Sequence, residues 1–308
     1  MEKSRKTRIL SGISLTFATV LWGLNYVAQQ EGSKHLDPFT FNMLRMWIAA
    51  VFILPIILYL NHKDFKKLSF WTEDDNIKET VLGGIITGLV LISGLTCQQT
   101  GIRYTSVGKA GFLSSLSIIF VPLISILEGK KVRLYQWLGI FFSLLGAAIL
   151  SFNDFNGINI GDLFMIATAF FIALHIMTAG HFNKRVDSIK FSFFRFLFAG
   201  FFSFIIFMIF EDLTWATLSL VWKPVLFSGI FGSCVAFTLM ALSQRNLDNV
   251  STSIIMSLES VFSLLSGWII LGQKLSGREI LGSAILFTAV MAMQVYGGLK
   301  ARKEKVND

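Results

Sequence analysis

Charged side chains are scarce in this sequence. Of its 308 residues, 15% are Asp, Glu, Lys or Arg and 54% are hydrophobic, and the mean hydropathy is +0.65. Soluble globular domains carry about 25% charged residues, because their surfaces face water. The composition therefore excludes an ordinary soluble domain and indicates a polytopic membrane protein.

Residues and motifs that carry chemistry are also few. The two cysteines, Cys97 and Cys234, lie in apolar stretches without metal-binding spacing, so we expect packing residues and no disulfide. The sequence contains no H-E-x-x-H or G-x-S-x-G motif and no nucleotide-binding loop. We therefore expect no enzymatic activity, no direct drive by ATP, and no cofactor or metal.

Long apolar runs are what the sequence has in abundance. A helix needs about 20 residues to cross about 30 Å of hydrocarbon. Ten segments of this kind are predicted, at 9–28, 38–60, 80–97, 105–127, 134–152, 160–179, 189–210, 224–242, 249–271 and 277–295. The first follows the basic start MEKSRKTR without a convincing cleavage site, so we expect a retained helix rather than a signal peptide.

Basic residues are unevenly distributed over the predicted connections. If the N-terminus is inside, most of the 27 Lys and Arg residues lie in the two termini and in the connections on the same side. Basic connections favour the cytoplasmic side, so both termini are expected there. The net charge of +8 is thus a topology signal, and no nucleic-acid partner is expected.

The sequence also matches itself at an offset of about 145 residues. LDPFTFNMLRMWIAA, which contains Arg45, aligns with VDSIKFSFFRFLFAG, which contains Arg195. The segment from Tyr104 aligns with the one from Leu247 and pairs Gly129 with Gly272. Since each unit holds five spans, the second unit is inverted relative to the first. We predict an all-α fold of two inverted repeats, 1–155 and 156–308, a geometry suited to alternating access.

The block SLESVFSLLSGWIILGQKLSGREILGSAIL, with the ten spans and the duplication, resembles the EamA family of the drug/metabolite transporter superfamily. Ser260 and Gln273 depart from the family, which often has Pro and Glu there. The resemblance implies a bacterial inner-membrane exporter or importer of small metabolites, often amino acids or related compounds. It also implies a cavity lined mainly by helices one, three, four, six, eight and nine, without implying a particular substrate.

A carboxylate interrupts the ninth apolar run at Glu259. A charge at the bilayer centre costs about 2.5–3.5 kcal/mol, so it needs a partner, a wet cavity or a proton. Helical projection puts Ser263 near Glu259 and Ser257 further round the polar side. Glu259 either ties helices together or is a site for a proton or for a cationic or amino group. Its counterpart in the first repeat is Leu116, so the acid breaks the internal symmetry, which favours a functional role.

Other polar residues within the spans are further candidates for substrate binding or coupling. These are Trp22, Asn25, Tyr26, Gln98, Gln99, Ser114 and His175. Two alternatives stay open for them: Tyr26 could sit at a membrane interface, and His175 could be a buried histidine bonded to a backbone carbonyl.

The remaining charges within the spans have structural interpretations. Lys109 lies near a helix end, where we expect its ammonium to reach water. Arg45 and Arg195 occupy matched positions, so we expect both to anchor helices or loops, with Asp37 and Asp187 as candidate partners. Gly84 and Gly88 form a G-x-x-x-G pair that predicts a close helix contact.

The sequence thus favours a secondary transporter whose partners are a small-molecule substrate, the lipid bilayer and, if it is coupled to them, protons. A passive channel is less favoured, because no charged ring or repeated filter segment is present. An intramembrane enzyme is the third alternative. Substrate, direction, coupling ion and oligomeric state are open at this point.

Overall fold

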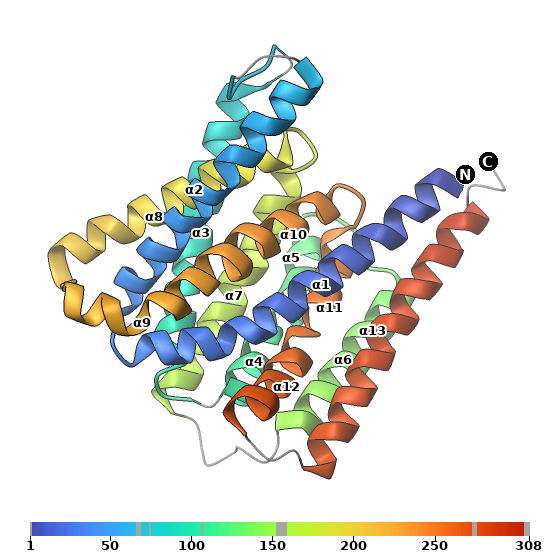
Figure 1. Ribbon diagram of the computed structural model, residues 1–308. Helices are drawn as coiled ribbons and strands as arrows, with labels where there is room; N and C mark the ends of the chain where they lie inside the picture. The colour runs from blue at the N-terminus through green and yellow to red at the C-terminus, as the bar shows by residue number, and fades with distance from the viewer. Residues whose placement is uncertain are drawn as a thin grey trace.

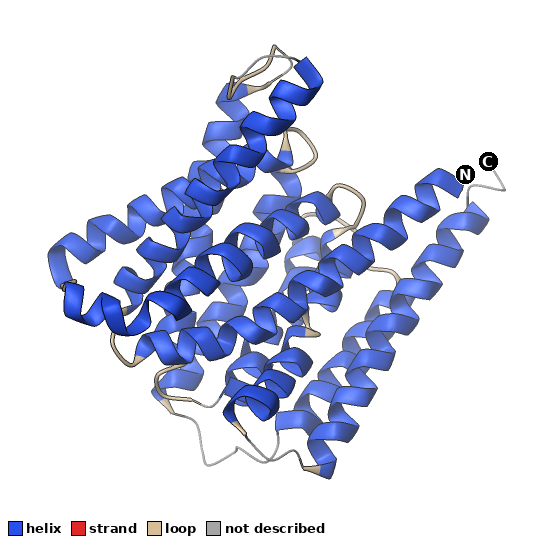
Figure 2. Ribbon diagram, in the orientation of Figure 1, coloured by secondary structure: helices blue, strands red, loops and turns tan. Residues whose placement is uncertain are grey.

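The computed structural model describes residues 2–65, 69–73, 75–105, 107–151, 159–272 and 276–304, and these ranges contain helices and no β-strand (Figures 1 and 2). The first half holds α1 (Glu2–Ser33), α2 (Pro38–Phe65), α3 (Ile77–Gly101), α4 (Val107–Ser115), α5 (Ser117–Leu127) and α6 (Leu134–Ser151). The second half holds α7 (Ile160–Phe182), α8 (Ser188–Phe210), α9 (Trp215–Phe227), the π-helix η2 (Ser228–Val235), α10 (Ala236–Gln244), α11 (Asn249–Met256), α12 (Glu259–Leu271) and α13 (Gly277–Glu304). They correspond to the ten predicted spans, three of which are divided.

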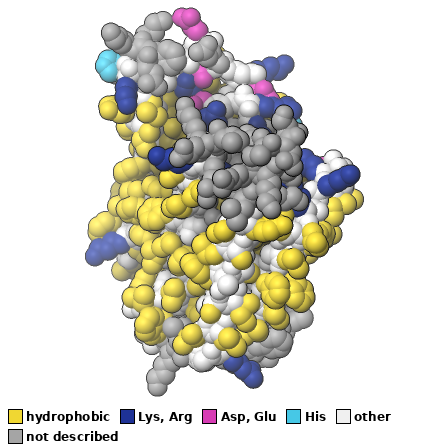
Figure 3. Space-filling model, turned by 90° about the vertical axis from the view of Figure 1, so that its right-hand side faces the viewer, with side chains coloured by type: hydrophobic (Ala, Val, Ile, Leu, Met, Phe, Trp, Pro, Cys, Tyr) yellow, Lys and Arg dark blue, Asp and Glu magenta, His cyan; other side chains and the backbone are white. Residues whose placement is uncertain are grey.

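The lengths and surfaces of these helices fit a membrane. Eight described segments are long and apolar enough to cross one, and shorter apolar stretches lie at Leu134–Ile149 and Ile280–Met293. Figure 3 shows hydrophobic side chains over the middle of one face, with Lys and Arg mainly toward its upper end. The chain is therefore a multi-pass membrane protein.

The two halves pack with a pseudo-two-fold relationship. α2 packs on its counterpart α8, and α6 on its counterpart α13. Likewise, α3 packs on α7, and the counterpart of α3, the α9–η2–α10 segment, packs on α1, which is the counterpart of α7. α1 and α7 start at opposite ends of the molecule (Figure 1), which is the predicted inversion. The predicted boundary at residue 155 lies outside the described residues.

Two matched glycines show that the repeat extends to local geometry. Gly129 follows α5 with φ +76°, and Gly272 follows α12 with φ +66°. This left-handed conformation is unfavourable for residues with a Cβ, so both helices end where the sequence places glycine. Nothing lies within 4 Å of a Cβ added at either position, so conformation alone explains these two glycines.

The fourth and ninth segments are both interrupted near their centres. At Leu116 the backbone N–H bonds Leu113, three residues back, and at Leu258 it bonds Ile255. Serine hydroxyls next to both breaks also bond carbonyls three residues back, as Ser115 does at 2.7 Å. Such back-bonding competes with the helical ladder and bends helices. The serine-rich sequence therefore accounts for two matched breaks.

The predicted close helix contact is confirmed between α3 and α8. A Cβ added at Gly84 would lie 2.4 Å from Phe194 Cβ, and one at Gly88 would lie 2.9 Å from the backbone oxygen of Arg195. The absence of side chains at Gly84 and Gly88 is thus what lets α8 approach α3 so closely.

Candidate functional site

A cavity of about 30 Å³ lies between the two halves, next to the breaks in the fourth and ninth segments. All six segments expected to line a cavity contribute to it, and α2 adds Arg45. The polar side chains among its walls are Trp22, Asn25, Tyr26, Gln29, Arg45, Gln98, Ser114, Ser115, Ser117 and Glu259. The two repeats therefore converge on one polar site.

A chain of polar side chains crosses this cavity. Gln98 Nε2 donates to the Tyr26 hydroxyl at 3.0 Å, and that hydroxyl lies 2.7 Å from Ser114 Oγ. Ser114 Oγ in turn lies 3.5 Å from Glu259 Oε1. Tyr26 is fully buried, so the membrane-interface alternative for this residue is wrong. This row of polar side chains links α1, α3 and α4 to the first residue of α12.

Glu259 stands where the ninth segment resumes after its break. It is the first residue of α12, and its side chain is partly buried at the cavity wall. The first N–H groups of α12 after Glu259 bond carbonyl oxygens of the break, as that of Ser260 does with Ser257. The break therefore coincides with the position of the acid at the cavity wall.

The first helix contacts the π-helix across the same cavity. Trp22 Nε1 donates to the backbone oxygen of Gly232 at 3.0 Å, and Asn25 packs where a Cβ of Gly232 would lie. A π-helix turns the backbone out of the regular ladder, which leaves this oxygen available to a side chain. Trp22 and Asn25 are thus positioned by η2, whose form the sequence pattern did not predict.

The matched arginines have different surroundings. Arg195 Nη2 donates to the Phe237 backbone oxygen and to Ser192 Oγ, both at 3.1 Å, and its guanidinium lies over three phenylalanine rings. Arg45 instead lines the cavity, and its buried Nε and Nη2 have no hydrogen-bond partner among the described residues. The anchoring role predicted for both therefore fits the contacts of Arg195, while Arg45 is a cavity residue that sequence reasoning missed.

Four candidates are not among the cavity walls. Ser257 and Ser263 bond carbonyls of their own segment, Ile254 and Ser260, at 2.7 and 2.9 Å. Gln99 Nε2 donates to the Gln29 backbone oxygen at 3.0 Å.

The fourth is His175, which is fully buried. Its Nε2 lies 3.4 Å from Arg195 Nη1 and not against a backbone carbonyl. Two alternatives were considered for His175, a cavity residue and a histidine bonded to a backbone carbonyl. Both are therefore wrong.

Two stretches of the chain, residues 10–152 and 159–294, match the model of the EamA-like transporter family. The chain belongs to this family. It is a membrane transporter, as the resemblance in its closing block implies.

Relatives of this EamA-like transporter match over most of their lengths. An uncharacterized transporter of Archaeoglobus fulgidus is 26% identical, over 94% of this chain and 87% of the relative. The uncharacterized transporter YoaV of Bacillus subtilis is 24% identical, over 89% and 93%. One protein of known crystal structure shares the fold with TM-score 0.72 and 18% identity, over 91% of this chain and 94% of that one.

The EamA-like transporter also holds a buried ion pair that corrects the prediction for Lys109. Its Nζ lies 2.7 Å from Asp162 Oδ2, and the two side chains are 7% and 3% exposed. Asp162 accepts the Asn159 backbone N–H at 2.9 Å in the capping box that starts α7. Lys109 therefore joins the fourth segment to α7 and does not extend to water.

The predicted partners of the two arginines are engaged elsewhere. Asp37 Oδ1 lies 3.0 Å from Arg103 Nη2. Asp187 accepts the backbone N–H groups of Ile189 and Lys190 at 3.0 and 2.8 Å, and so caps α8. Pairing of Asp37 and Asp187 with Arg45 and Arg195 is therefore wrong.

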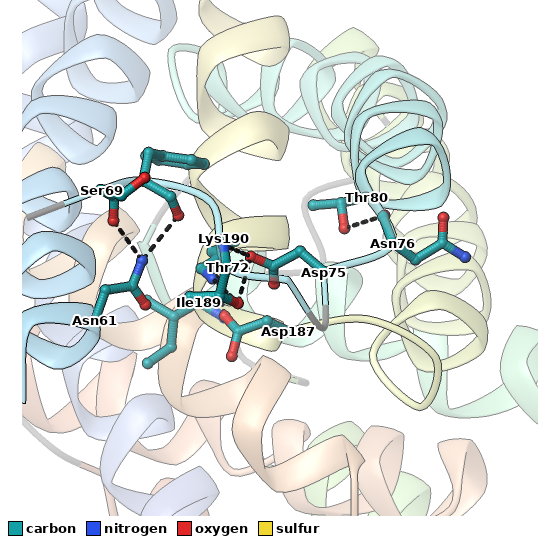
Figure 4. Close-up of polar contacts among 10 residues, drawn as sticks. Asn61, Ser69, Thr72, Asp75, Asn76, Thr80, Asp187, Ile189 and Lys190 are labelled. Atoms are coloured by element: carbon teal, nitrogen blue, oxygen red, sulfur yellow. Dashed lines mark hydrogen bonds and ion pairs between the residues drawn. The ribbon is translucent and has the colours of Figure 1, made fainter. Parts of the chain in front are cut away.

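Two further contacts join the halves at their ends. In the Asp75 clamp (Asp75, Thr72 and Lys190), Lys190 Nζ at the start of α8 donates to Asp75 Oδ2 of the α2–α3 loop at 2.5 Å (Figure 4). Asp75 also accepts the Thr72 backbone N–H at 2.6 Å. The loop of the first half is thereby held to the first turn of a helix in the second.

The Glu211 clamp (Glu211, Phe39 and Thr40) is its counterpart. Glu211, directly after α8, accepts the backbone N–H of Phe39 at 3.1 Å and that of Thr40 at 2.6 Å, at the start of α2. Thr40 and Lys190 occupy aligned positions in the two repeats, although their side chains differ.

Proposed function

We propose that this protein is a secondary active transporter that moves small metabolites across a bacterial inner membrane by alternating access, with both termini in the cytoplasm. The observation that carries the proposal is the position of Glu259 at a helix break, facing the cavity between the inverted halves. Interrupted helices near the midplane, at the interface of repeats, are where such transporters bind substrate and coupling ions.

The charges of the cavity favour a substrate with an amino and a carboxylate group. Glu259 is an acid and Arg45 a base on the same small cavity, and Arg45 has buried donors without a partner among the described residues. Unpaired buried donors are costly, so a carboxylate that accepts from them is favoured. Amino acids and related zwitterions carry both complementary groups.

The cavity is small, so binding of a substrate requires movement of the two halves. Its volume of about 30 Å³ suits one or two water molecules. A metabolite of several heavy atoms requires the halves to separate around it. The clamps suit this motion, because the Asp75 clamp joins the halves at one end and the Glu211 clamp at the other. Opening one end releases one clamp while the other holds.

Proton coupling gives Glu259 its role in the cycle. When its carboxyl is protonated the cavity carries one negative charge fewer, and when it is ionised it attracts the substrate's amino group. Exchange of a proton for substrate at this side chain then links the two fluxes. The pair Tyr26 and Ser114 orients the carboxyl through the contact at 3.5 Å.

The test is flux into proteoliposomes under an imposed pH gradient, with radiolabelled amino acids, amines and nucleosides as probes. The proposal expects saturable, gradient-driven uptake of at least one probe, which Glu259→Gln abolishes or uncouples. Glu128→Gln is the matched control, because Glu128 is an exposed acid paired with Lys130. Unsaturable flux would support a channel, an altered product an enzyme, and unchanged uptake by Glu259→Gln at all pH values would overturn the coupling role.

A further inference from the structure

A second, larger cavity lies at the end of the molecule that holds the α2–α3 loop. Its volume is about 390 Å³, and it shares no residue with the central cavity. Its walls come from the end of α2, the α2–α3 loop, the turn between α7 and α8, and the turn after α10. Binding sites for small ligands commonly have volumes of about 300–1,000 Å³, so this cavity is large enough for one.

Basic side chains outnumber acidic ones on its walls. The charged wall residues are Lys184, Arg185, Lys190, Arg245, Asp75 and Asp187. Both acids are occupied: Asp75 by Lys190 and Thr72, and Asp187 by backbone N–H groups at the start of α8 (Figure 4). Arg185 Nη1 lies 3.2 Å from Glu79 Oε1.

This pairing leaves two cations, on two different turns, facing the same cavity. Lys184 and Arg245 are exposed, and within the described part of the chain neither side chain has a hydrogen bond or ion pair. The turns that carry them follow α7 and α10. An anion that lies between the two turns can contact both residues. Without it, these two side chains face only solvent.

We infer that this cavity binds a phosphate-bearing anion, held by Lys184 and Arg245. Arginine offers a planar fork that matches phosphate oxygens, and lysine adds a compact positive charge. Basic pockets between transmembrane helices on the cytoplasmic side are suited to lipid phosphates. By the distribution of basic residues, this end of the molecule is the cytoplasmic one. The inference does not depend on the transport cycle proposed above.

The phosphate can come from a lipid headgroup or from a soluble anion. A lipid is compatible with the cavity, because Ile57, Leu60 and Ile189 form an apolar part of its wall. Ile56 and Tyr59, on the same stretch of α2, are exposed apolar side chains of the membrane-facing surface. A soluble phosphate would use the same two cations without these apolar contacts.

Thermal unfolding of the purified full-length protein in a neutral detergent tests the inference. The probes are short-chain phosphatidylglycerol, inorganic phosphate and, as a zwitterionic control, phosphatidylcholine. A ligand that binds the folded state raises the melting temperature by mass action. We expect saturable stabilisation by phosphatidylglycerol or by phosphate, and none by phosphatidylcholine.

The variant Lys184→Gln/Arg245→Gln removes the two free cations. Because charge-assisted hydrogen bonds to phosphate oxygens are lost, the half-saturating concentration should rise at least about tenfold. The charge-matched control is Lys63→Gln/Lys78→Gln, which removes two exposed cations near the same loop that do not line the cavity. This control should stay within about twofold of the wild type.

The outcomes separate cleanly. Stabilisation by phosphatidylglycerol alone assigns a lipid headgroup, and stabilisation by inorganic phosphate assigns a soluble anion. The inference is overturned if neither probe stabilises the wild type, if Lys184→Gln/Arg245→Gln responds like the wild type, or if the control loses the response equally. Failure of amino acid transport with intact anion binding would instead count against the proposed transport cycle alone.

Discussion

Lys190 and Asp75 form an ion pair between the two halves of the transporter, with Nζ 2.5 Å from Oδ2 and side chains only 6% and 8% exposed. The equivalent position at the start of α2 is held differently, by Glu211 and the backbone N–H groups of Phe39 and Thr40. The inverted repeats therefore keep the position of the clamp at both ends while its chemistry differs.

Replacing Asp75 by Asn should strongly destabilise the protein. The ammonium of Lys190 would stay buried without an anion, which typically costs about 3–5 kcal/mol. The control is Glu79→Gln, because Glu79 pairs with an Arg185 side chain that is 55% exposed, a contact worth at most about 1 kcal/mol. Unfolding by a denaturing detergent measures both; equal losses for the two variants would contradict the prediction.

The same residue should make stability depend on acid pH. Burial by itself would raise the pKa of Asp75, but hydrogen bonds from Lys190 and Thr72 outweigh burial and hold this pKa below its ordinary value. The folded state thus binds the proton less tightly than the unfolded state. The stabilisation is full above about pH 4 and is lost as the pH falls through the folded-state pKa. In melting curves from pH 3 to 7, the difference in melting temperature between the wild type and Asp75→Asn should become smaller only below about pH 4.

Adding one methyl group at Gly84 should loosen the contact between α3 and α8. The new Cβ would lie 2.4 Å from Phe194 Cβ and 3.0 Å from the backbone of that residue, so one helix must shift. Overpacking of this kind costs about 1–3 kcal/mol. Gly108→Ala is the control, since its Cβ would meet only Leu264 Cδ1 at 3.8 Å. Alanine favours a helix over glycine by about 1 kcal/mol, so Gly108→Ala should be neutral or stabilising. Equal melting temperatures for the two variants would refute this account.

Removing the charge of Lys109 should expose the cost of a buried, unpaired acid. Lys109→Met leaves Asp162 without its ammonium partner, at a cost of about 3–5 kcal/mol. The double variant Lys109→Met/Asp162→Asn should recover part of this loss, because the remaining amide carries no charge. Lys34→Met, which breaks an exposed pair with Glu31, should cost at most about 1 kcal/mol. No recovery in the double variant would show that the pair contributes through packing alone.

Patterns within single segments accounted for the architecture. Apolar runs of about 20 residues predict spans, because each must bury its backbone hydrogen bonds within one helix. The duplication predicts inversion, since five spans bring the second repeat in from the opposite side. Gly129, Gly272 and the pair Gly84 and Gly88 were readable for similar reasons: each concerns local backbone conformation or the absence of a side chain.

Partner choice between distant segments was decided only by the tertiary structure. Arg45 and Arg195 align in sequence, yet one lines the cavity and the other bonds a backbone oxygen. Lys109 finds Asp162, 53 residues away, and Ser114 faces Glu259 while its counterpart Ser257 bonds its own helix. A buried polar group takes whichever partner the packing brings within about 3 Å, and the helices that meet around it are not encoded in its own segment. The sequence by itself therefore determined the ten spans, their inversion and the anomalous acid, while the packing of the two halves determined what that acid faces.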